Sequence, residues 1–328
     1  MSSTPNTTPP ERQELDATLR PHTFEEYVGQ DQAKKNVIIS IEAARMRGDM
    51  PEHFLFYGPP GIGKTTLAHL IAHTLQKNIR VTSGVAIERA GDLAAVLTNL
   101  EDNDILFIDE IHRLPKKVEE LLYPALESGS LDIILGKGPS ARTVQLPLPR
   151  FTLIGATTHI AAVSSPLRSR FGGGIHGLEL YTKEEIAHIL RRSASILNVT
   201  ADDDVFEHIA IRSRRTPRTA NFLLKRFRDY GTVLEKPLTK DLFCEACDLF
   251  GIDALGLSKE DRKYLSILHT TFRGGPAGIR GLASALHEDP ETLEDLYEPY
   301  LVELGFVERT PRGRILTERG YSHLGIEK

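Results

Sequence analysis

The chain has 328 residues, of which 40% are hydrophobic and 26% are charged, and its formal net charge is −5. This composition excludes a wholly disordered chain, a collagen-like fibre and a small disulfide-stapled fold. No apolar run approaches the ~20 residues that span a bilayer, and the polar start does not resemble a signal peptide, so we expect a cytoplasmic protein of two or three domains. Cys244 and Cys247 form a single CxxC pair, which we interpret as packed within a helix rather than as half of a zinc site.

Residues 1–181 combine a polar start with an α/β pattern. Residues 1–16 are rich in Ser, Thr, Pro and Asn, and a segment that buries so little is expected to be a mobile tail. Buried strands are predicted from HFLFYG (53–58), DILFIDE (104–110) and FTLIGATT (151–158), with a fourth over 178–181. Helices are predicted over 64–76 and around 118–126. Because strands that alternate with helices form parallel sheets covered on both faces, we predict an α/β domain over 17–181.

The segment 131–148, LDIILGKGPSARTVQLPL, interrupts this alternation. Its two β-rich arms flank a Gly-Lys-Gly-Pro turn, which is typical of a hairpin. We therefore predict a hairpin inserted into the α/β domain. A projecting hairpin commonly contacts a partner, and decoration of a sheet edge is the alternative.

The remainder of the chain is mainly helical. Residues 182–250 show about four helical patterns, and we assign 182–254 to a helical second domain. GIDALGLS (251–258) has the composition of a linker. Over 255–328, three helical patterns precede FVERTPRGRILTE, which predicts a strand, a tight turn and a strand. This order is typical of a winged-helix domain, a variant of the helix-turn-helix.

GPPGIGKT (58–65) matches the phosphate-binding pattern G-x-x-x-x-G-K-[ST] in full, between a predicted strand and a predicted helix. Glycines let backbone N–H groups turn toward phosphate oxygens, and the following helix directs the positive end of its dipole at the same anion. Lys64 is expected to reach the outer phosphates and the Thr65 hydroxyl to bind Mg²⁺. The predicted ATP-binding residues of this loop are Gly58, Gly61, Gly63, Lys64, Thr65 and Thr66.

Two acidic residues, Asp109 and Glu110, end the predicted strand ILFIDE. In nucleotide hydrolases an aspartate at this place acts at Mg²⁺, and a neighbouring carboxylate can polarise a water for attack on the γ-phosphate. The alternative is a pair of acids that only caps a strand. Together with the complete phosphate-binding loop, the pair predicts an ATPase.

Further motifs are spread over the length of the chain. They are LRP…YVGQ (19–30), FYGPPGIGKTTLA (56–68), TSG…AGDLAA (82–95), LFIDEIHRL (106–114), GATT (155–158), SPLRSRFG (165–172), TPRTAN (216–221) and RTPRGR (309–314). Together they resemble the AAA+ ATPases and, more narrowly, the RuvB family of bacterial Holliday-junction branch-migration ATPases. The resemblance extends over residues 15–328 and implies a P-loop NTPase domain, a helical lid and a winged helix.

The resemblance also implies roles for individual residues. Thr157, in GATT, matches the sensor of the γ-phosphate. Arg170, in SPLRSRF, matches the arginine finger that stabilises the charge of phosphoryl transfer in the neighbouring subunit. Arg218, in TPR, matches a second sensor on the lid. The positions that line the nucleotide pocket in the family are matched by Leu19, Arg20 and Tyr181.

The partners implied by the resemblance are duplex DNA in a Holliday junction, the junction-binding protein RuvA and the resolvase RuvC. The family forms a homo-oligomeric ring, which we expect to be a hexamer, and its arm for RuvA matches the hairpin 131–148. Two departures from the family pattern concern the site. GGGIHG (172–177) is expected to loosen the chain beside Arg170, and Arg215 stands where the family usually has Gly.

The candidate DNA contact is the turn of the C-terminal hairpin. The segment 255–328 carries ten Lys or Arg and twelve Asp or Glu, so the domain as a whole is not basic. The turn nevertheless holds Arg309, Arg312 and Arg314 without an acidic residue. Such a turn can lie on a phosphate backbone while acidic helices face away, and a solvated hairpin tip is the alternative. The turn has no aromatic residue for base stacking, so we expect contact that does not depend on sequence.

The sequence therefore predicts an ATP-dependent DNA translocase that drives branch migration in recombination and repair. Another AAA+ remodeller, such as a clamp-loader-like ATPase, is the alternative, and it would carry a helical collar in place of the winged helix. An ATP-switched transcription regulator is a second alternative, which a wing of arginines alone disfavours.

Overall fold

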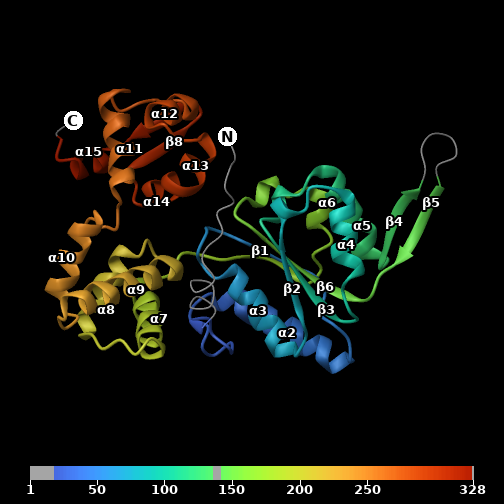
Figure 1. Ribbon diagram of the computed structural model, residues 1–328. Coiled ribbons are helices and arrows are strands. Elements are labelled where there is room, and N and C mark those ends of the chain that lie inside the picture. The colour runs from blue at the N-terminus through green and yellow to red at the C-terminus, as the bar shows by residue number, and fades with distance from the viewer. Residues whose placement is uncertain (1–17, 136–141, 327–328) are drawn as a thin grey trace. The chain divides into compact units, whose positions relative to one another are not determined.

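The computed structural model describes residues 18–135 and 142–326, so the predicted N-terminal tail and the turn of the inserted hairpin lie outside the described residues. The chain divides into two compact units, Met1–Tyr181 and Thr182–Lys328. Figure 1 shows an α/β unit followed by a helical one that ends in a small mixed domain.

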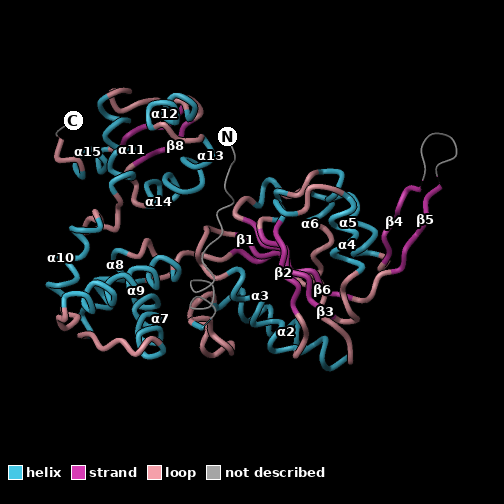
Figure 2. The backbone as a smooth tube through the Cα atoms, viewed as in Figure 1, coloured by secondary structure: helices cyan, strands magenta, loops and turns pink. Residues whose placement is uncertain are grey.

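The centre of the first unit is a five-stranded sheet with the order β2-β3-β6-β1-β7, and all of its pairs are parallel (Figure 2). Its strands are β1 (Phe54–Tyr57), β2 (Ile79–Ser83), β3 (Asp104–Asp109), β6 (Phe151–Thr157) and β7 (Gly174–Gly177). The three strands predicted from apolar runs occupy the middle of the sheet as β3, β6 and β1. Their residues are almost all buried, because helices cover both faces.

The strands at the two edges of the sheet differ from those predicted from the sequence. The fourth predicted strand, 178–181, is not a strand, and the chain pairs with β1 four residues earlier, at Gly174–Gly177. Glycines carry no apolar signal, so the pattern pointed to the leucines that follow. β2 was not predicted, because its residues IRVTS are half-exposed at the other edge and do not form an apolar run.

Helices lie on both faces of the sheet (Figure 1). The first unit contains α2 (Asp31–Arg47), α3 (Lys64–Leu75), α4 (Ala90–Thr98), α5 (Lys116–Glu127) and the short α6 (Ser165–Arg168). α4 and α5 share one apolar cluster with the sheet, in which Leu93, Leu97 and Leu122 pack with Leu106 and Leu153. α3 contacts β3 and β6, and its Leu67, Leu70 and Ile71 are fully buried.

The inserted hairpin is formed by β4 (Ser130–Leu135) and β5 (Arg142–Pro147), which pair antiparallel from Ser130↔Pro147 to Leu135↔Arg142. It follows α5 directly and makes its own two-stranded sheet. Figure 1 shows that it stands out from the α/β unit beyond α5. Its two strands thus form a hairpin of their own, outside the main sheet.

The second unit begins with four helices and ends in a winged helix. The four helices are α7 (Lys183–Ile196), α8 (Asp203–Arg212), α9 (Pro217–Leu234) and α10 (Lys240–Phe250). The winged helix contains α11 (Lys259–Thr270), α12 (Ile279–Leu286), α13 (Pro290–Thr292), the π-helical η5 (Leu293–Tyr297), α14 (Glu298–Glu303), β8 (Val307–Thr310), β9 (Gly313–Leu316) and α15 (Glu318–His323). One apolar cluster joins these helices and the β8–β9 wing.

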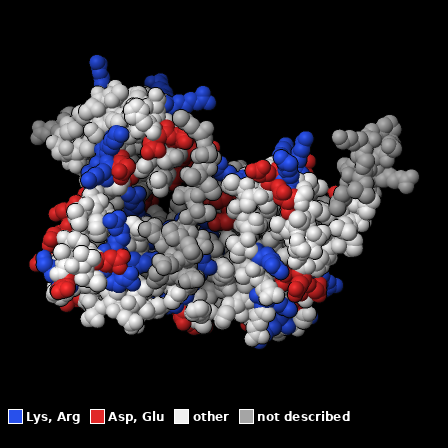
Figure 3. Space-filling view, in the orientation of Figure 1, with Lys and Arg blue, Asp and Glu red and all other residues white. Residues whose placement is uncertain are grey.

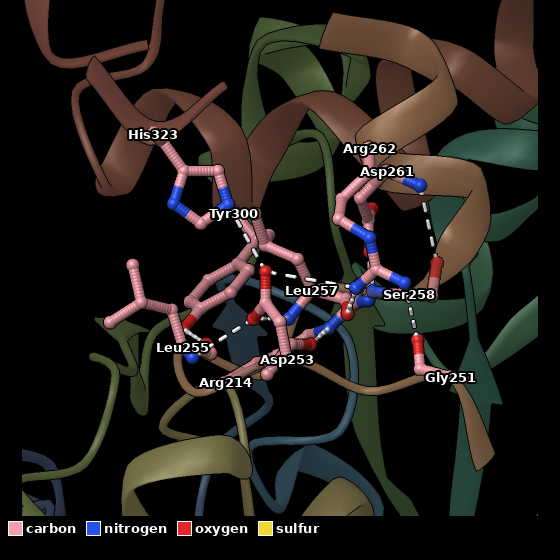
Figure 4. Close-up of polar contacts among 11 residues, drawn as sticks. Arg214, Gly251, Asp253, Leu255, Leu257, Ser258, Asp261, Arg262, Tyr300 and His323 are labelled. Atoms are coloured by element: carbon pink, nitrogen blue, oxygen red, sulfur yellow. Dashed lines mark hydrogen bonds and ion pairs between the residues drawn. The ribbon is translucent and has the colours of Figure 1, made fainter. Parts of the chain in front are cut away.

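The linker 251–258 inside this unit is held by polar contacts (Figure 4). Asp253 Oδ1 accepts hydrogen bonds of 2.9 Å from the backbone N–H groups of Leu255 and Leu257. Its other oxygen lies 3.1 Å from His323 Nε2. From the first helix of the winged domain, Arg262 donates to the carbonyl oxygens of Leu257 at 2.9 Å and Gly251 at 3.0 Å. The segment predicted as a linker thus has a fixed conformation.

Arg214 connects the four-helix part to this linker (Figure 4). Its Nε donates to the carbonyl of Gly256 at 3.1 Å, its Nη2 contacts the fully buried Asp261, and its guanidinium lies 5.3 Å from the ring centre of Tyr300. Gly256 has φ 82°, and a Cβ there would lie 2.3 Å from the carbonyl oxygen of Arg212. Only glycine allows this close approach of the two segments.

Candidate functional site

The phosphate-binding loop lies between the end of β1 and the start of α3, as the sequence predicts. Gly58, Gly61 and Gly63 have φ of 142°, 80° and 103°, values that favour glycine. A Cβ on Gly58 would lie 2.4 Å from the carbonyl oxygen of Leu178. Lys64 is only 7% exposed and donates from Nζ to the carbonyl oxygens of Gly58 at 2.7 Å and Pro59 at 3.0 Å.

This loop has the features of an anion site. Its backbone curves around the N-terminus of a 12-residue helix, where four N–H groups have no partner within the helix and the dipole favours negative charge. The Lys64 ammonium lies over the same loop. The hydroxyls of Thr65 and Thr66 follow in the first turn of α3 and are half-buried. The donor set therefore fits a polyphosphate.

Asp109 and Glu110 lie at the carboxyl end of β3, on the edge of the sheet where β1 and β6 also end. Glu110 has left-handed backbone angles, with φ 46° and ψ 50°, and its N–H donates to Asp109 Oδ1 at 3.0 Å. A Cβ on the neighbouring Gly84 would lie 2.3 Å from the Glu110 carbonyl oxygen, so the turn is packed against glycine. A non-glycine residue in this conformation is uncommon, and here the backbone turns sharply at the end of β3.

The Glu110 carboxylate is oriented by residues from β6 and from the turn after β3. Its Oε2 accepts hydrogen bonds from the backbone N–H and the hydroxyl of Thr158, at 3.1 and 3.0 Å. His112 Nδ1 lies 3.2 Å from the same oxygen and 2.9 Å from Thr157 Oγ1. Glu110 is thus the centre of a hydrogen-bonded group.

The two threonines of GATT differ in what they contact. Thr157, the predicted sensor, is fully buried, and its hydroxyl also accepts the N–H of His159 at 2.9 Å. Thr158 is half-buried and holds Glu110 directly. Thr158 and His112 could not be identified from the sequence. Two adjacent threonines at a strand end cannot be ranked until the end of the strand is known, and the contact of His112 with Glu110 is visible only in the structure.

The predicted pocket residues before β1 and after β7 lie beside the loop. Tyr181 is buried and donates to the carbonyl of Ile62 at 3.1 Å. Gln30 exchanges two hydrogen bonds with the backbone of Glu179, of 2.7 and 2.9 Å, which joins the two segments. A Cβ on Gly63 would lie 2.8 Å from the Tyr27 hydroxyl. Burial raises the pKa of that hydroxyl well above its ordinary value, so it stays protonated.

Leu19 and Arg20 belong to the same region. Leu19 is 6% exposed and Arg20 is half-buried. Burial and then the Arg20 charge lower the pKa of His69, which lies on α3, so this imidazole is held neutral. The positive charge of Arg20 therefore acts close to the helix that begins at the phosphate-binding loop.

Arg170 follows α6 and is folded against α5 of its own chain. Its Nη2 lies 3.0 Å from Glu127 Oε1, its Nη1 donates to the Pro166 carbonyl at 2.7 Å, and its guanidinium lies 4.6 Å from the ring centre of Tyr123. The side chain is 20% exposed. The predicted arginine finger is therefore engaged within the chain.

The glycines after Arg170 pack closely instead of loosening the chain. Gly173 donates from its N–H to the His53 carbonyl at 2.9 Å, and a Cβ there would lie 2.7 Å from the Glu52 carbonyl oxygen. Gly174 has φ 112° and is the first residue of β7. The run of glycines lets this segment approach the start of β1.

In the second unit, Arg218 is exposed near the start of α9, and it makes no hydrogen bond or ion pair with any residue that the structure describes. Thr216 caps this helix by accepting the N–H of Thr219. Arg215 has φ 56° and pairs with Glu303 at 2.6 Å. The positive φ is the conformation that favours glycine at this position, and Arg215 adopts it while making an ion pair.

The wing places two of its three arginines in an intramolecular cluster. Glu298 is fully buried and accepts from Arg309 Nε at 2.7 Å, Arg314 Nε at 2.9 Å and the Tyr264 hydroxyl at 2.9 Å. Arg314 also pairs with Glu294 at 2.5 Å and is only 15% exposed. Burial and the Glu298 charge raise the pKa of Tyr264 far above its ordinary value. Arg314 and Arg309 thus neutralise a buried carboxylate.

Arg312 differs from these two. It is exposed at the turn between β8 and β9, and its side chain makes no ion pair within 18–135 and 142–326. Acidic side chains occupy the helical segment that packs behind the wing, among them Glu291, Glu294 and Asp295. Figure 3 shows acidic atoms gathered over that part of the domain, near α13. The turn thus carries an exposed positive charge, whereas the helical segment beside it is acidic.

Other features add no site to these. Burial raises the pKa of the Cys247 thiol on α10 to about 11, so it remains protonated. The described residues contain no group of three or more His, Cys, Asp or Glu placed to hold a metal. Among them there is also no helix long and apolar enough to cross a membrane.

Three family models match consecutive parts of the chain. The P-loop domain of the Holliday junction DNA helicase RuvB matches residues 19–176, the RuvB AAA lid domain matches 181–253, and the RuvB C-terminal winged helix domain matches 254–325. Together they cover nearly all of the described residues.

Individual relatives agree with these matches. The Holliday junction branch migration complex subunit RuvB of Dehalococcoides mccartyi (strain CBDB1) is 54% identical over 313 residues, which span 95% of this chain and 89% of that protein. The solved structure of the Thermotoga maritima RuvB Holliday junction branch migration motor is 46% identical, with a TM-score of 0.86 over 95% of this chain and 99% of that chain. A mutant of the same protein is 48% identical, with a TM-score of 0.88 over 94% and 99% of the two chains.

Proposed function

The chain belongs to the RuvB family of AAA+ ATPases, and we propose that it is the ATP-driven motor that moves Holliday junctions along DNA. The observation that carries this proposal is the pairing of two features in one chain. A complete phosphate-binding loop and the Glu110 carboxylate lie at the same edge of the sheet, and a winged helix carries the exposed Arg312. The clamp-loader alternative lacks support, because the C-terminal domain is a winged helix and not a helical collar.

ATP hydrolysis would use the residues at the carboxyl edge of the sheet. The loop N–H groups and Lys64 bind the phosphates and offset their charge. Glu110, held by Thr158, orients a water toward the γ-phosphate and takes up its proton. Thr158, whose hydroxyl donates to Glu110, would exchange this partner for a phosphate oxygen. We assign it to the sensor role that the sequence analysis gave to Thr157.

Oxygen ligands at this edge suit Mg²⁺. The Thr65 hydroxyl and the Asp109 carboxylate are the groups that would hold the ion, and both are half-buried beside the loop. When bound, Mg²⁺ supplies positive charge to the phosphate oxygens. Leu19, Arg20 and Tyr181 would enclose the rest of the nucleotide.

The proposed working form is a homo-oligomeric ring, a hexamer, around duplex DNA. Arg170 would complete the site of the neighbouring subunit, because a cation supplied in trans stabilises the transition state of phosphoryl transfer. Arg218 would reach nucleotide from the lid, and its lack of an ion pair with any described residue leaves its guanidinium available. ATP hydrolysis at this shared site would then move the lid and the winged helix.

DNA contact is assigned to the wing. Arg312 would bind phosphate directly, and Arg309 and Arg314 would hold the wing in shape through Glu298. Since phosphates carry no base identity, this contact would not depend on sequence. RuvA would bind the hairpin 131–148, and RuvC would act on the same junction. We expect the protein to work in the cytoplasm.

The deciding experiment measures ATP turnover of the purified protein alone, with junction DNA, and with junction DNA plus RuvA. Together with turnover, the movement of a labelled junction is followed. We expect DNA plus RuvA to increase turnover and the junction to migrate only with ATP. Turnover that is indifferent to junction DNA and RuvA, with no migration, would reject the proposal.

A further inference from the structure

The contacts of Arg170 occupy most of its guanidinium. Nη1 donates to the Pro166 carbonyl at 2.7 Å and reaches Ser169 Oγ at 3.4 Å, while Nη2 pairs with Glu127 at 3.0 Å. Nε is buried and has no hydrogen-bond partner among the described residues. A phosphate that approached this side chain would therefore find Nη1 bound to its own chain and Nη2 paired with the Glu127 carboxylate.

The surface beneath Arg170 is itself rigid. The Tyr123 hydroxyl donates to Glu119 at 2.9 Å and lies 3.1 Å from Ser164 Oγ, and Ser164 also contacts Glu119. Ser164 caps α6 by accepting the N–H of Leu167 at 3.2 Å. Glu119 is 6% exposed. Hydrogen bonds thus connect the Tyr123 ring, which lies under the guanidinium, with α6, the helix before Arg170. Glu127 lies beside this group and is exposed.

Glu127 is poorly placed for helix stability. It is the last residue of α5, and a negative charge at a helix C-terminus is unfavourable in the field of the helix dipole. No basic residue lies in the last turn of that helix to offset it. The favourable partner of Glu127 is therefore Arg170, in tertiary contact.

We propose that Glu127 is a positioning residue that holds Arg170 in its own subunit and competes for it with the phosphates of the neighbouring nucleotide. This rests on the proposed role of Arg170 as a finger in trans. When the finger acts, Nη2 exchanges the Glu127 carboxylate for a phosphate oxygen. The γ-phosphate carries more charge than one carboxylate, so it can win this competition, and release also frees the buried Nε to find a partner. Glu127 thus sets a threshold that favours a neighbour loaded with ATP.

The size of the effect follows from the exposure of the pair. Glu127 is 62% exposed, and exposed ion pairs of this kind shift an equilibrium by up to about fivefold. Glu127→Gln should therefore raise the kcat for ATP by up to about fivefold, with KM changing less, because the finger acts on charge that develops in the transition state. ADP affinity should not change.

The experiment compares four proteins under conditions where rings form: wild type, Glu127→Gln, Arg170→Ala and the double variant. Glu120→Gln, an exposed glutamate on the same helix, is the matched control and should behave as wild type. The double variant should equal Arg170→Ala, because Glu127 acts only through Arg170. The thermal unfolding midpoint of Glu127→Gln is measured to exclude a general loss of structure.

The outcomes separate this proposal from the function on which it rests. Normal turnover by Arg170→Ala would remove the finger and the restraint together. If Arg170→Ala is slow while Glu127→Gln is unchanged or slower than wild type, the finger stands and the restraint is rejected. A gain from Glu127→Gln that persists in the Arg170→Ala background would also reject it, since the effect would then not pass through Arg170.

Discussion

Glu110 combines left-handed backbone angles with a carboxylate whose Oε2 is held by hydrogen bonds. Its φ of 46° is costly for a residue with a side chain, and the cost is met by contacts with Asp109 and Thr158. Its Oε2 is held by the backbone N–H and the hydroxyl of Thr158. In the proposed mechanism, Lys64 would serve nucleotide binding and Glu110 would serve hydrolysis.

Glu110→Gln and Lys64→Ala should therefore fail in different ways. The glutamine keeps the size of the side chain but cannot take up a proton, so the variant should bind ATP and lose hydrolysis. The alanine removes the cation that offsets phosphate charge, so that variant should lose both. Fluorescent-nucleotide titration and turnover measurements test this. Glu110→Gln protein that hydrolyses ATP at the normal rate would show that Glu110 does not act on the water.

The neighbouring threonines give a second test at this scale. Thr158→Val removes the hydroxyl that holds Glu110 and should reduce turnover with little change in stability. Thr157→Val removes a fully buried, hydrogen-bonded hydroxyl and should destabilise the fold by about 1–3 kcal/mol. Turnover and denaturant unfolding of the two variants are compared. Equal losses of turnover at equal stability would contradict the assignment of the sensor role to Thr158.

Among the elements, the wing shows how far the sequence could be interpreted. The strand, turn and strand were predicted correctly, because turn residues separate two β-rich arms. The partner of each arginine could not be predicted, since Glu298 lies eleven residues before Arg309 and on a different element. The same limit applies to Thr158 and Glu110, which meet only when β3 and β6 pair. Spacing within a motif is visible in a sequence, whereas contacts between motifs depend on register.

Arg312 and Arg314 should consequently respond differently to substitution. Arg312→Ala should weaken binding to unrelated duplexes equally and reduce the slope of log K against log salt by about 0.9, the value for one lost phosphate contact. Its stability should match wild type. Salt titrations on two unrelated duplexes measure the slope. An unchanged slope would place the DNA contact elsewhere, with the arginines at 212–218 as the next candidates.

Arg314→Ala should act mainly on stability. It leaves the fully buried Glu298 with one fewer cation, and breaking a buried pair of this kind costs about 3 kcal/mol. Urea unfolding of the purified protein gives the difference, and Arg312→Ala serves as the control from the same turn. If Arg314→Ala were as stable as wild type, Glu298 would not depend on this partner.

At the scale of the whole molecule, the proposed ring divides each catalytic site between two subunits. The phosphate-binding loop and Glu110 come from one subunit, and Arg170 comes from the next. A subunit with a defective loop can still supply a finger, and a subunit without a finger can still bind ATP. A site divided in this way would depend on assembly of the ring.

Mixing variants tests the division. Arg170→Ala alone should lose turnover by up to about 10³-fold, and Lys64→Ala alone should be inactive. Mixed rings should regain part of the activity, because a Lys64→Ala subunit supplies the finger that its Arg170→Ala neighbour lacks. Exchange of labelled subunits establishes that mixed rings form. No recovery in such rings would place Arg170 outside the shared site.

The linker between the lid helices and the winged helix has a consequence for how displacement reaches DNA. Residues 251–258 are held by Asp253, Arg262 and Arg214, and the backbone at Gly256 touches that of Arg212. A connection with this many contacts would resist bending, so in the proposed motor a rotation of the lid would be passed on to the winged helix. The wing then travels an arc whose length is the angle of rotation multiplied by its distance from the pivot. In the proposed motor, the radius of this arm would set the distance that DNA advances for each ATP.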